Sequence, residues 1–257
     1  MKVGLFGIWL LAALAGISQA RAEKVIITTG EYAPYNSPDF KHYGLMPRLI
    51  SEAFRLRGIE VQFRFYPWAR AYELSKHGKV NGTAHWYDSA ERREDHFYSD
   101  NILDETVVWF HLKATQFDWN ELEDVGKYRV GAVQGYTYNA AFYEAIEKGL
   151  LHVEFVPEDT QNYKKLLIGR IEAVPEVIDI GMYILHQNFP RETVALVTQH
   201  PKPFFQASTH LLLSRQIEDS ERLIKLFNEG LAELKASGLY DDYLLESRQG
   251  LYAPAPD

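Results

Sequence analysis

The strongest constraint on the fold is an alternation of strand and helix patterns that runs along the chain in two successive sets. The first set opens with a short apolar strand pattern at residues 24–30, a helical pattern at 44–58 and an alternating strand pattern at 60–66. Strand, helix and strand in this order predict a crossover unit of a parallel sheet. The order begins again with a strand and a glycine turn at residues 128–135. Two sets are better explained by two α/β lobes than by one long sheet.

The remaining segments follow the same periodicity rules. The first set continues with a helix, a strand and a long apolar strand at 68–78, 80–87 and 102–113. After its first strand, the second set alternates helix and strand at 137–149, 152–157, 160–169, 171–177, 180–188 and 193–199. A tail adds a strand at 207–214 and an amphipathic helix at 220–238, and periodicity does not say which lobe receives them.

The first 22 residues have the pattern of a cleaved secretory signal. Lys2 leads into an apolar run at residues 5–17, and the run closes on the small-residue pattern of residues 20–22. This run is too short for a membrane span, which takes about 20 apolar residues. We expect cleavage after Ala22, or alternatively after Ala20, and export to the periplasm.

Charge and cysteine content narrow the range of partners. Removing residues 1–22 takes away two of the 27 basic residues and none of the 35 acidic ones, so the mature net charge is 25 minus 35, or −10. An acidic surface argues against nucleic acid and anionic membranes as partners. The chain has no cysteine, so it has neither a disulfide nor a thiol for a lipid anchor. These features favour a soluble periplasmic protein.

Motifs for metal binding and catalysis are missing from the sequence. The nine histidines include no close pair with metal-ligand spacing. No nucleophile motif and no phosphate-binding glycine loop occurs. We therefore predict no metal site, no cofactor and no catalytic residue.

Several segments carry a resemblance to a known family. They are, in chain order, "GEYAPY", "YPWARAYELSKHGKVNG", "SAERREDHFYSD", "LEDVGKYRVGAVQGYTY", "LLIGRIEA" and "LAELKASGLYDDYL". Through them the chain resembles the bacterial extracellular solute-binding proteins of family 3, the polar amino-acid-binding receptors of ABC transporters. The likeness covers nearly all of Glu23 to Leu245.

The resemblance implies an α/β, two-lobed periplasmic-binding-protein fold with a hinge of two crossing strands. Lobe 1 would comprise residues 23–111 plus 206–257, and lobe 2 residues 112–205. A small-molecule solute would lie in the cleft between the lobes, and a membrane transporter permease would be the partner of a monomeric receptor. General rules also place ligands at the carboxyl ends of strands and in clefts between domains.

The resemblance singles out Arg92 as the residue that grips a solute carboxylate. It matches the family's arginine within the segment Ser89-Ala90-Glu91-Arg92. A planar guanidinium can offer two parallel hydrogen bonds to a carboxylate, whereas lysine offers only a point charge. The alternative is a surface arginine that pairs with Glu91 or Glu94.

Aromatic side chains are expected to line the lobe 1 side of the cleft. Flat rings can stack on a solute while their polar tips form hydrogen bonds with it. Tyr87 stands where the family usually has a serine or threonine, which favours a solute larger than a small α-amino acid. The alternative is that these rings form the edge of the core. The candidates are Tyr32, Tyr35, Trp68, Trp86 and Tyr87.

Lobe 2 is expected to contribute Gly135 and Thr137. They lie where a strand ends in a glycine turn and a helix opens, so the Thr137 hydroxyl and nearby backbone N–H groups can bind an anionic oxygen. The resemblance assigns this turn to a second carboxylate contact. A role as a helix N-cap would also explain Thr137.

The family's aspartate for the solute amine falls on Val177, which cannot pair with a cation. Glu176 and Asp179 lie nearby, and strand alternation places Glu176 on the opposite side from Val177 unless Pro175 breaks the register. Either the solute lacks a standard α-amino-acid head group, or Glu176 or Asp179 has taken over its recognition.

Three functions follow from these residues. The leading one is a receptor that captures a carboxylate-bearing, amino-acid-like or aromatic solute. The second is a dehydratase-like enzyme on the same scaffold, for which Glu176 is the candidate general acid. The third is a sensing protein whose closed lobes contact a signalling partner.

Overall fold

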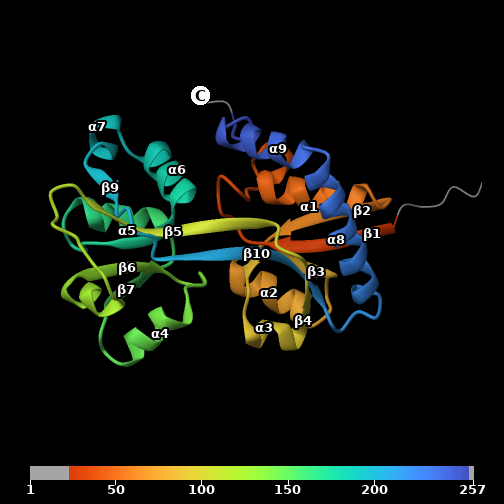
Figure 1. The fold of residues 1–257 in the computed structure, drawn as a ribbon, viewed down its shortest axis with the longest axis horizontal. Coiled ribbons are helices and arrows are strands. Elements are labelled where there is room, and N and C mark those ends of the chain that lie inside the picture. Colours follow the sequence, from red (N-terminus) through yellow and green to blue (C-terminus); the bar gives the residue numbers. More distant parts are fainter. Residues whose placement is uncertain (1–22, 255–257) are drawn as a thin grey trace, which may run out of the picture.

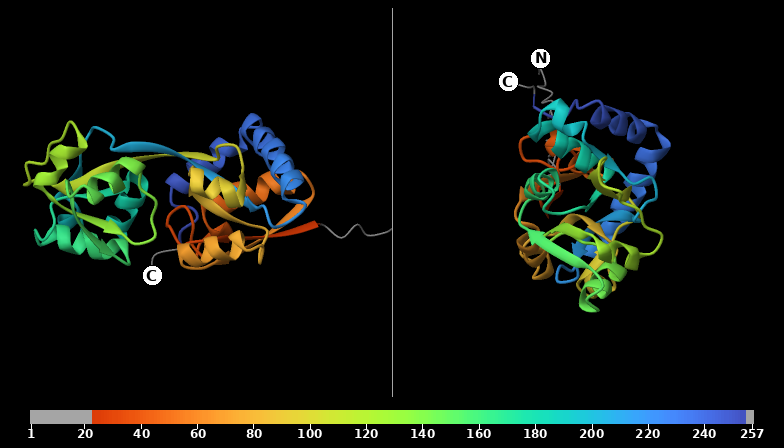
Figure 2. Two further views of the ribbon diagram at one scale, coloured as in Figure 1. Left: turned by 90° about the horizontal axis from the view of Figure 1, so that it is seen from below. Right: turned by 90° about the vertical axis from the view of Figure 1, so that its left-hand side faces the viewer.

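A computed structural model describes residues 23–254, and it shows two α/β lobes joined by two long strands (Figure 1). The strands β5 (Leu103–Leu112) and β10 (Phe205–Ser214) run antiparallel from one lobe into the other. A second view shows the same two strands crossing between the lobes (Figure 2). The predicted two-lobed fold with a hinge of two crossing strands is therefore confirmed.

The first lobe is built from the predicted crossover units. Strand β1 (Glu23–Thr29) lies parallel to both β2 (Ile59–Phe65) and β3 (Gly82–Tyr87). Helix α1 (Leu45–Arg55) connects β1 to β2, and helix α2 (Trp68–Lys76) connects β2 to β3. The sheet continues in the order β2-β1-β3-β10-β5-β8, and the short strand β4 (His96–Tyr98) pairs with β10 after helix α3 (Ala90–Asp95).

The tail packs on lobe 1. Helix α8 (Ser220–Ala236) lies against α1, where the rings of Phe54 and Phe227 are 5.1 Å apart. A Cβ on Gly230 would lie 2.0 Å from the backbone oxygen of Ala53, so only glycine allows the two helices to approach this closely. A further helix, α9 (Leu239–Arg248), begins after Gly238, and the sequence patterns did not predict it.

The second lobe repeats the architecture with shorter strands. Strand β6 (Arg129–Val133) is parallel to β7 (His152–Val156), and β8 (Val174–Val177) pairs antiparallel with β5. The helices and short elements of this lobe are α4 (Ala140–Glu147), α5 (Asp159–Leu167), α6 (Ile178–Asn188), α7 (Arg191–Val194), the 3₁₀ turn Leu122–Lys127 and strand β9 (Val197–Gln199). A further 3₁₀ turn, Lys41–Tyr43, precedes α1 in the first lobe.

One predicted strand is only partly correct. Residues 193–199 were expected to be extended, but α7 continues to Val194 and only Val197–Gln199 forms strand β9. Pro190 stands immediately before α7, where its fixed φ suits a helix start and its missing N–H costs nothing.

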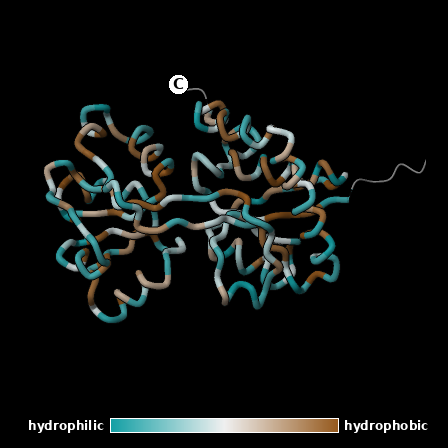
Figure 3. Tube along the Cα trace, in the orientation of Figure 1, coloured by the Kyte–Doolittle hydropathy of each residue, from teal (hydrophilic) through white to brown (hydrophobic). Residues whose placement is uncertain are grey.

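Apolar residues concentrate inside both lobes (Figure 3). Trp109 on β5 belongs to the lobe 2 core with Phe117 and Phe142, although the same strand also lies in lobe 1. The boundaries 23–111 plus 206–257 and 112–205 stay a prediction, and the expected signal at 1–22 lies outside the described residues. Within residues 23–254, no helix combines the length and apolar character that a bilayer crossing needs.

Candidate functional site

A bulge at the end of β3 sets the floor of the cleft. Trp86 pairs with His210 and Ala84 with Leu211, so His85 between them is the extra residue of a β-bulge, with φ of 70°. Bulges redirect side chains and are frequent beside binding sites. Here the bulge turns the His85 ring toward the hinge strand β5.

His85 joins a buried polar network with Glu105 of β5. His85 Nε2 lies 2.6 Å from Glu105 Oε1, and the Tyr87 hydroxyl donates to Glu105 Oε2 at 2.5 Å. Both members of the His85 and Glu105 pair are shielded from water, with 1% and 0% of their side chains exposed. The amide nitrogen of Asn36 lies 2.9 Å from His85 Nδ1. This network fixes the end of β3 against the hinge.

Arg92 lies on α3 and reaches across the cleft. Its Nη2 donates to the Thr137 hydroxyl of lobe 2 at 2.9 Å, and its guanidinium lies 4.7 Å from the Trp86 ring centroid. Its Nη1 is buried and has no hydrogen-bond partner among residues 23–254. The neighbouring Arg93 instead forms an exposed ion pair with Asp88. Arg92 therefore has an unused, buried donor close to the contact between the lobes, and its role in solute binding stays a prediction.

Gly135 and Thr137 lie in the turn after β6, as expected, but Thr137 is not a helix N-cap. Helix α4 begins at Ala140, and the Asn139 side chain accepts a hydrogen bond from the Phe142 N–H at 2.9 Å. The Thr137 hydroxyl is thereby left to accept from Arg92. Gly135 has φ of 82°, a left-handed conformation that favours glycine.

Four of the five predicted rings meet at the cleft. Tyr32 lies 6.2 Å from Trp68, and Trp68 lies 5.2 Å from Trp86, between ring centroids. With these rings and Tyr87, the structure encloses a small cavity of about 50 Å³. Trp68 packs directly on Gly30, where a Cβ would lie 2.3 Å from the indole.

Tyr35 is the exception among the five rings. Its hydroxyl donates to Asp179 of α6 at 2.8 Å, and both residues line a different cavity. Neither Tyr35 nor Asp179 lines the small cleft cavity.

Glu176 is buried where β8 ends. Its Oε1 accepts hydrogen bonds from the Tyr32 hydroxyl at 2.9 Å and from the Val177 N–H at 2.7 Å. Alternation along β8 sends the two neighbours to opposite sides, since Val177 lines the cavity that contains Asp179. Of the acids weighed from the sequence, Glu176 is therefore the one that meets the aromatic wall of lobe 1.

A second carboxyl group, Asp159, accompanies Glu176. The Tyr136 hydroxyl donates to Asp159 Oδ2 at 2.6 Å, and the rings of Tyr136 and Tyr32 are 5.3 Å apart. Burial raises the pKa of Glu176 well above its usual value of 4.5, and the nearby Asp159 charge raises it further. Burial also raises the pKa of Asp159. The Asp159 charge disfavours ionisation of Glu176, so the pair retains a proton more readily than isolated carboxyl groups do.

The cleft holds little free space at its innermost point, where the cavity of about 50 Å³ has room for ordered water but is far below the roughly 300–1,000 Å³ of small-molecule sites. A wider opening of about 630 Å³ adjoins it and is lined by Tyr32, Trp68, Tyr136 and Asp159 among others. The hydrogen bonds from Arg92 to Thr137 and from Tyr32 to Glu176 join the two lobes. These two bonds hold the lobes together at this point of the cleft.

Four residues of this site were not predicted to take part. Glu105, Tyr136 and Asp159 were not singled out, and His85 was considered only as one of several scattered histidines. The adjacency of Tyr136 to Thr137 was the available sequence signal. Within residues 23–254 there is no group of three or more potential metal-ligating side chains.

We compared the sequence with models of protein families. Residues 25–246 match the model of the bacterial extracellular solute-binding proteins, family 3. The chain belongs to this family. The expected resemblance is thus confirmed, and no curated protein sequence matches the chain.

Solved structures share the fold at low sequence identity. A histidine kinase sensor domain with similarity to periplasmic binding proteins has 19% identity and a TM-score of 0.72, over 88% of this chain and 96% of that one. An ancestral arginine-binding protein bound to arginine has 19% identity and a TM-score of 0.72, over 88% and 98%. An ancestral amino acid-binding protein, a precursor of cyclohexadienyl dehydratase, has 17% identity and a TM-score of 0.68, over 87% and 94%.

Proposed function

We propose that this family 3 protein is a periplasmic receptor that captures a small carboxylate-bearing solute between its lobes and presents the closed form to an ABC transporter. The observation that carries the proposal is the buried Nη1 of Arg92, which has no partner among residues 23–254 and lies at the point where the lobes meet. An unpaired buried donor is costly, and a solute carboxylate would satisfy it with a second, parallel hydrogen bond.

The residues at the other end of the cleft from Arg92 recognise the part of the solute away from its carboxylate. Glu176 lies against Tyr32, and Tyr136 connects the neighbourhood of Thr137 to Asp159. A solute that spans from Arg92 toward Glu176 carries an acid at one end and a hydrogen-bond donor at the other. Glu176, rather than Asp179, takes over the recognition that the family assigns to the position of Val177.

The aromatic wall favours a solute with a ring or a planar acid. The Trp68 and Trp86 rings lie nearly perpendicular to each other, at 81°, and the Arg92 guanidinium lies over the Trp86 ring. Such rings contact a flat molecule over a large area at small conformational cost. An aromatic amino acid or an aromatic carboxylic acid fits this setting better than a small polar amino acid.

Catalysis is the second candidate, and Glu176 supports it. The raised pKa of this buried carboxyl favours the protonated form, which is the form a general acid requires. Receptor and dehydratase differ in a simple measurement: prolonged incubation with cyclic carboxylic acids yields product only for the enzyme. We favour the receptor because Glu176 is already engaged by Tyr32 and the Val177 N–H.

A thermal-shift screen tests the proposed function. Polar amino acids, aromatic amino acids, and aromatic and aliphatic carboxylic acids are compared on the wild-type protein and on Arg92→Met. A tight ligand raises the melting temperature by mass action, and we expect the largest rise for a ring-bearing acid on the wild-type protein alone. An equal rise on Arg92→Met would contradict the proposal.

A further inference from the structure

A second cavity lies between the lobes, on the other side of the hinge strands from the cleft. Its volume is about 530 Å³, which falls in the range of roughly 300–1,000 Å³ typical of small-molecule sites. In Figure 1, α6 and α9 lie on one side of β5 and β10, and α3 and α4 lie on the other. We call this second space the hinge cavity.

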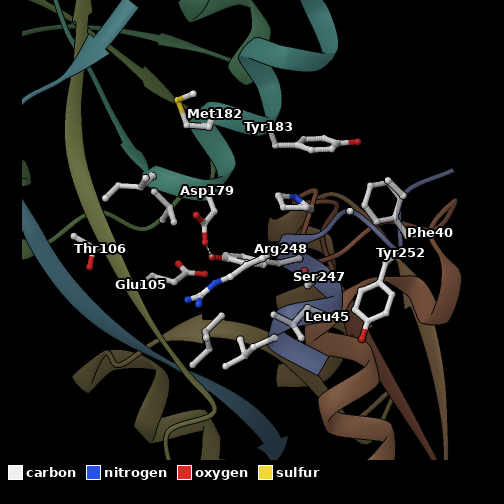
Figure 4. Close-up of a pocket in the computed structure, with 18 of the residues that line it drawn as sticks. Phe40, Leu45, Glu105, Thr106, Asp179, Met182, Tyr183, Ser247, Arg248 and Tyr252 are labelled. Atoms are coloured by element: carbon white, nitrogen blue, oxygen red, sulfur yellow. Dashed lines mark hydrogen bonds between the residues drawn. The ribbon is translucent and has the colours of Figure 1, made fainter. Parts of the chain in front are cut away.

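Both lobes build the apolar wall of the hinge cavity. Phe40 from lobe 1 and Tyr183 from α6 meet edge to face with ring centroids 5.9 Å apart. Leu45, Met182 and Tyr252 extend this surface, and Figure 4 shows their side chains around the cavity. A hydrocarbon or aromatic group would therefore be shielded from water on several sides.

One arginine and three acids also line the hinge cavity, namely Arg248, Asp104, Glu105 and Asp179; Figure 4 shows Arg248 with Glu105 and Asp179. Burial is the main cause of the raised pKa of Tyr35; the Asp179 carboxylate raises that pKa further and the Arg248 guanidinium lowers it. Both charges thus act on the same phenol. The Tyr35 hydroxyl donates to Asp179 Oδ2, and the Asp179 side chain retains acceptor capacity for a further donor.

We propose that the hinge cavity is a second binding site for a small zwitterion with an apolar side chain. Its carboxylate binds Arg248 and its ammonium group binds Asp179. Its side chain packs among Phe40, Leu45 and Met182. This site is distinct from the cleft because none of these five residues lines the cleft cavity.

Occupation of the hinge cavity is coupled to closure of the cleft. Glu105 lines both cavities and lies on the hinge strand β5. Rotation about β5 and β10 that opens the cleft brings α6 and α9 together, so a molecule between them opposes opening. By linkage, each ligand then strengthens the binding of the other.

Calorimetry with three probes tests the site. L-leucine, L-methionine and L-phenylalanine are titrated into the Arg92→Met protein, which lacks the cleft anchor. We expect at least one probe to bind, and we expect Arg248→Met in the same background to weaken it at least tenfold. Arg93→Met, which removes an exposed arginine paired with Asp88, is the matched control and should leave the affinity unchanged.

Two further readouts separate this site from a structural role of Arg248. Ser247→Trp places a bulky group in the cavity from a different position and should also prevent binding, with both variants keeping the wild-type thermal transition. Binding should reduce the radius of gyration of the Arg92→Met protein. The proposal is overturned if no probe binds Arg92→Met, or if Arg248→Met leaves the affinity unchanged; binding without compaction would refute the coupling.

Discussion

The two walls of the cleft differ in chemistry. The lobe 1 wall offers a cation and rings, namely Arg92 with Trp68 and Trp86, whereas the lobe 2 wall offers the hydroxyl of Thr137 and the carboxyl of Glu176. When the lobes meet, Thr137 accepts a hydrogen bond from Arg92, and Glu176 accepts one from Tyr32. Hydrogen bonds of this kind contribute only about 0.5–1.5 kcal/mol each, so closure without a solute is weakly favoured. Each wall therefore lacks hydrogen-bonding groups that the other wall supplies.

Removing the Arg92 guanidinium should have the largest effect on the affinity for a solute. Arg92→Met should weaken binding of a carboxylate solute by about 2 kcal/mol or more, about 30-fold, because the acid would be buried without its partner. Calorimetry measures the affinity, and Arg93→Met is the control because Arg93 pairs with Asp88 at the surface. A collapsed thermal transition for Arg92→Met would show instead that Arg92 stabilises the fold.

One titrating group in each lobe should change the free energy of unfolding with pH, and the two changes should have opposite signs. The group in lobe 1 should act at acidic pH. Burial lowers the pKa of His96 from 6.5 to about 4. The unfolded chain therefore takes up a proton in this range while the folded protein does not, so stability is lost as the pH falls from 6.5 to 4. His96→Gln should reduce this loss by about 2 kcal/mol. Urea denaturation at pH 4.5 and 7 measures the change in the free energy of unfolding with pH. An equal change in wild type and His96→Gln would show that His96 is not its cause.

Lobe 2 should respond at higher pH through Glu176. Its pKa is raised above 4.5, mainly by burial, so the folded protein holds this proton longer than the unfolded chain does. The contribution to stability is complete below pH 4.5 and declines as the pH rises toward the folded pKa. Glu176→Gln, which resembles the protonated acid, should remove the decline and become more stable relative to wild type as the pH rises above 4.5.

Glu172→Gln is the matched control for Glu176. The hydrogen bond from Arg129 lowers the pKa of Glu172, so its ionised form is the stabilising one. This variant should not gain stability at pH 8. Equal behaviour of the two variants would mean that the environment of Glu176 is not the cause.

The local parts of the site could be predicted from the sequence, and the parts that depend on packing could not. Arg92 and Gly135 lie in short motifs whose strand, turn and helix were visible as patterns. In the structure Arg92 bonds to Thr137 of the other lobe, and Gly135 lines the cleft cavity. Glu105 was hidden in an apolar strand because its partners, Tyr87 and the bulged His85, come from β3, and no sequence pattern indicates that pairing. The same limit applies to Asp159, whose neighbour Glu176 follows it by a whole helix and strand.

Tyr35 shows why loop residues are harder to place than strand residues. It shares the segment "GEYAPYN" with Tyr32, and nothing in this segment's sequence indicates that the two rings occupy different places. In the structure, the turn closed by the Tyr32 N–H to Asn36 carbonyl bond, 2.8 Å long, directs the two rings to different cavities. The crossover units, in contrast, follow from periodicity alone.

The smallest expected effect is a change in overall shape. A solute that bridges Arg92 and Thr137 should shift the protein toward the closed arrangement and reduce its radius of gyration. Small-angle scattering with and without saturating solute measures the change. An identical radius in both states would show that the two walls stay together at all times.

Mass spectrometry of the solute released when the purified, full-length mature protein is denatured tests the proposed receptor function most directly. We expect a small molecule with a carboxylate and a ring or planar group, which binds again to the refolded wild-type protein and fails to bind Arg92→Met. A released molecule without an acidic group, or one that rebinds Arg92→Met with the same affinity, would refute the proposed function.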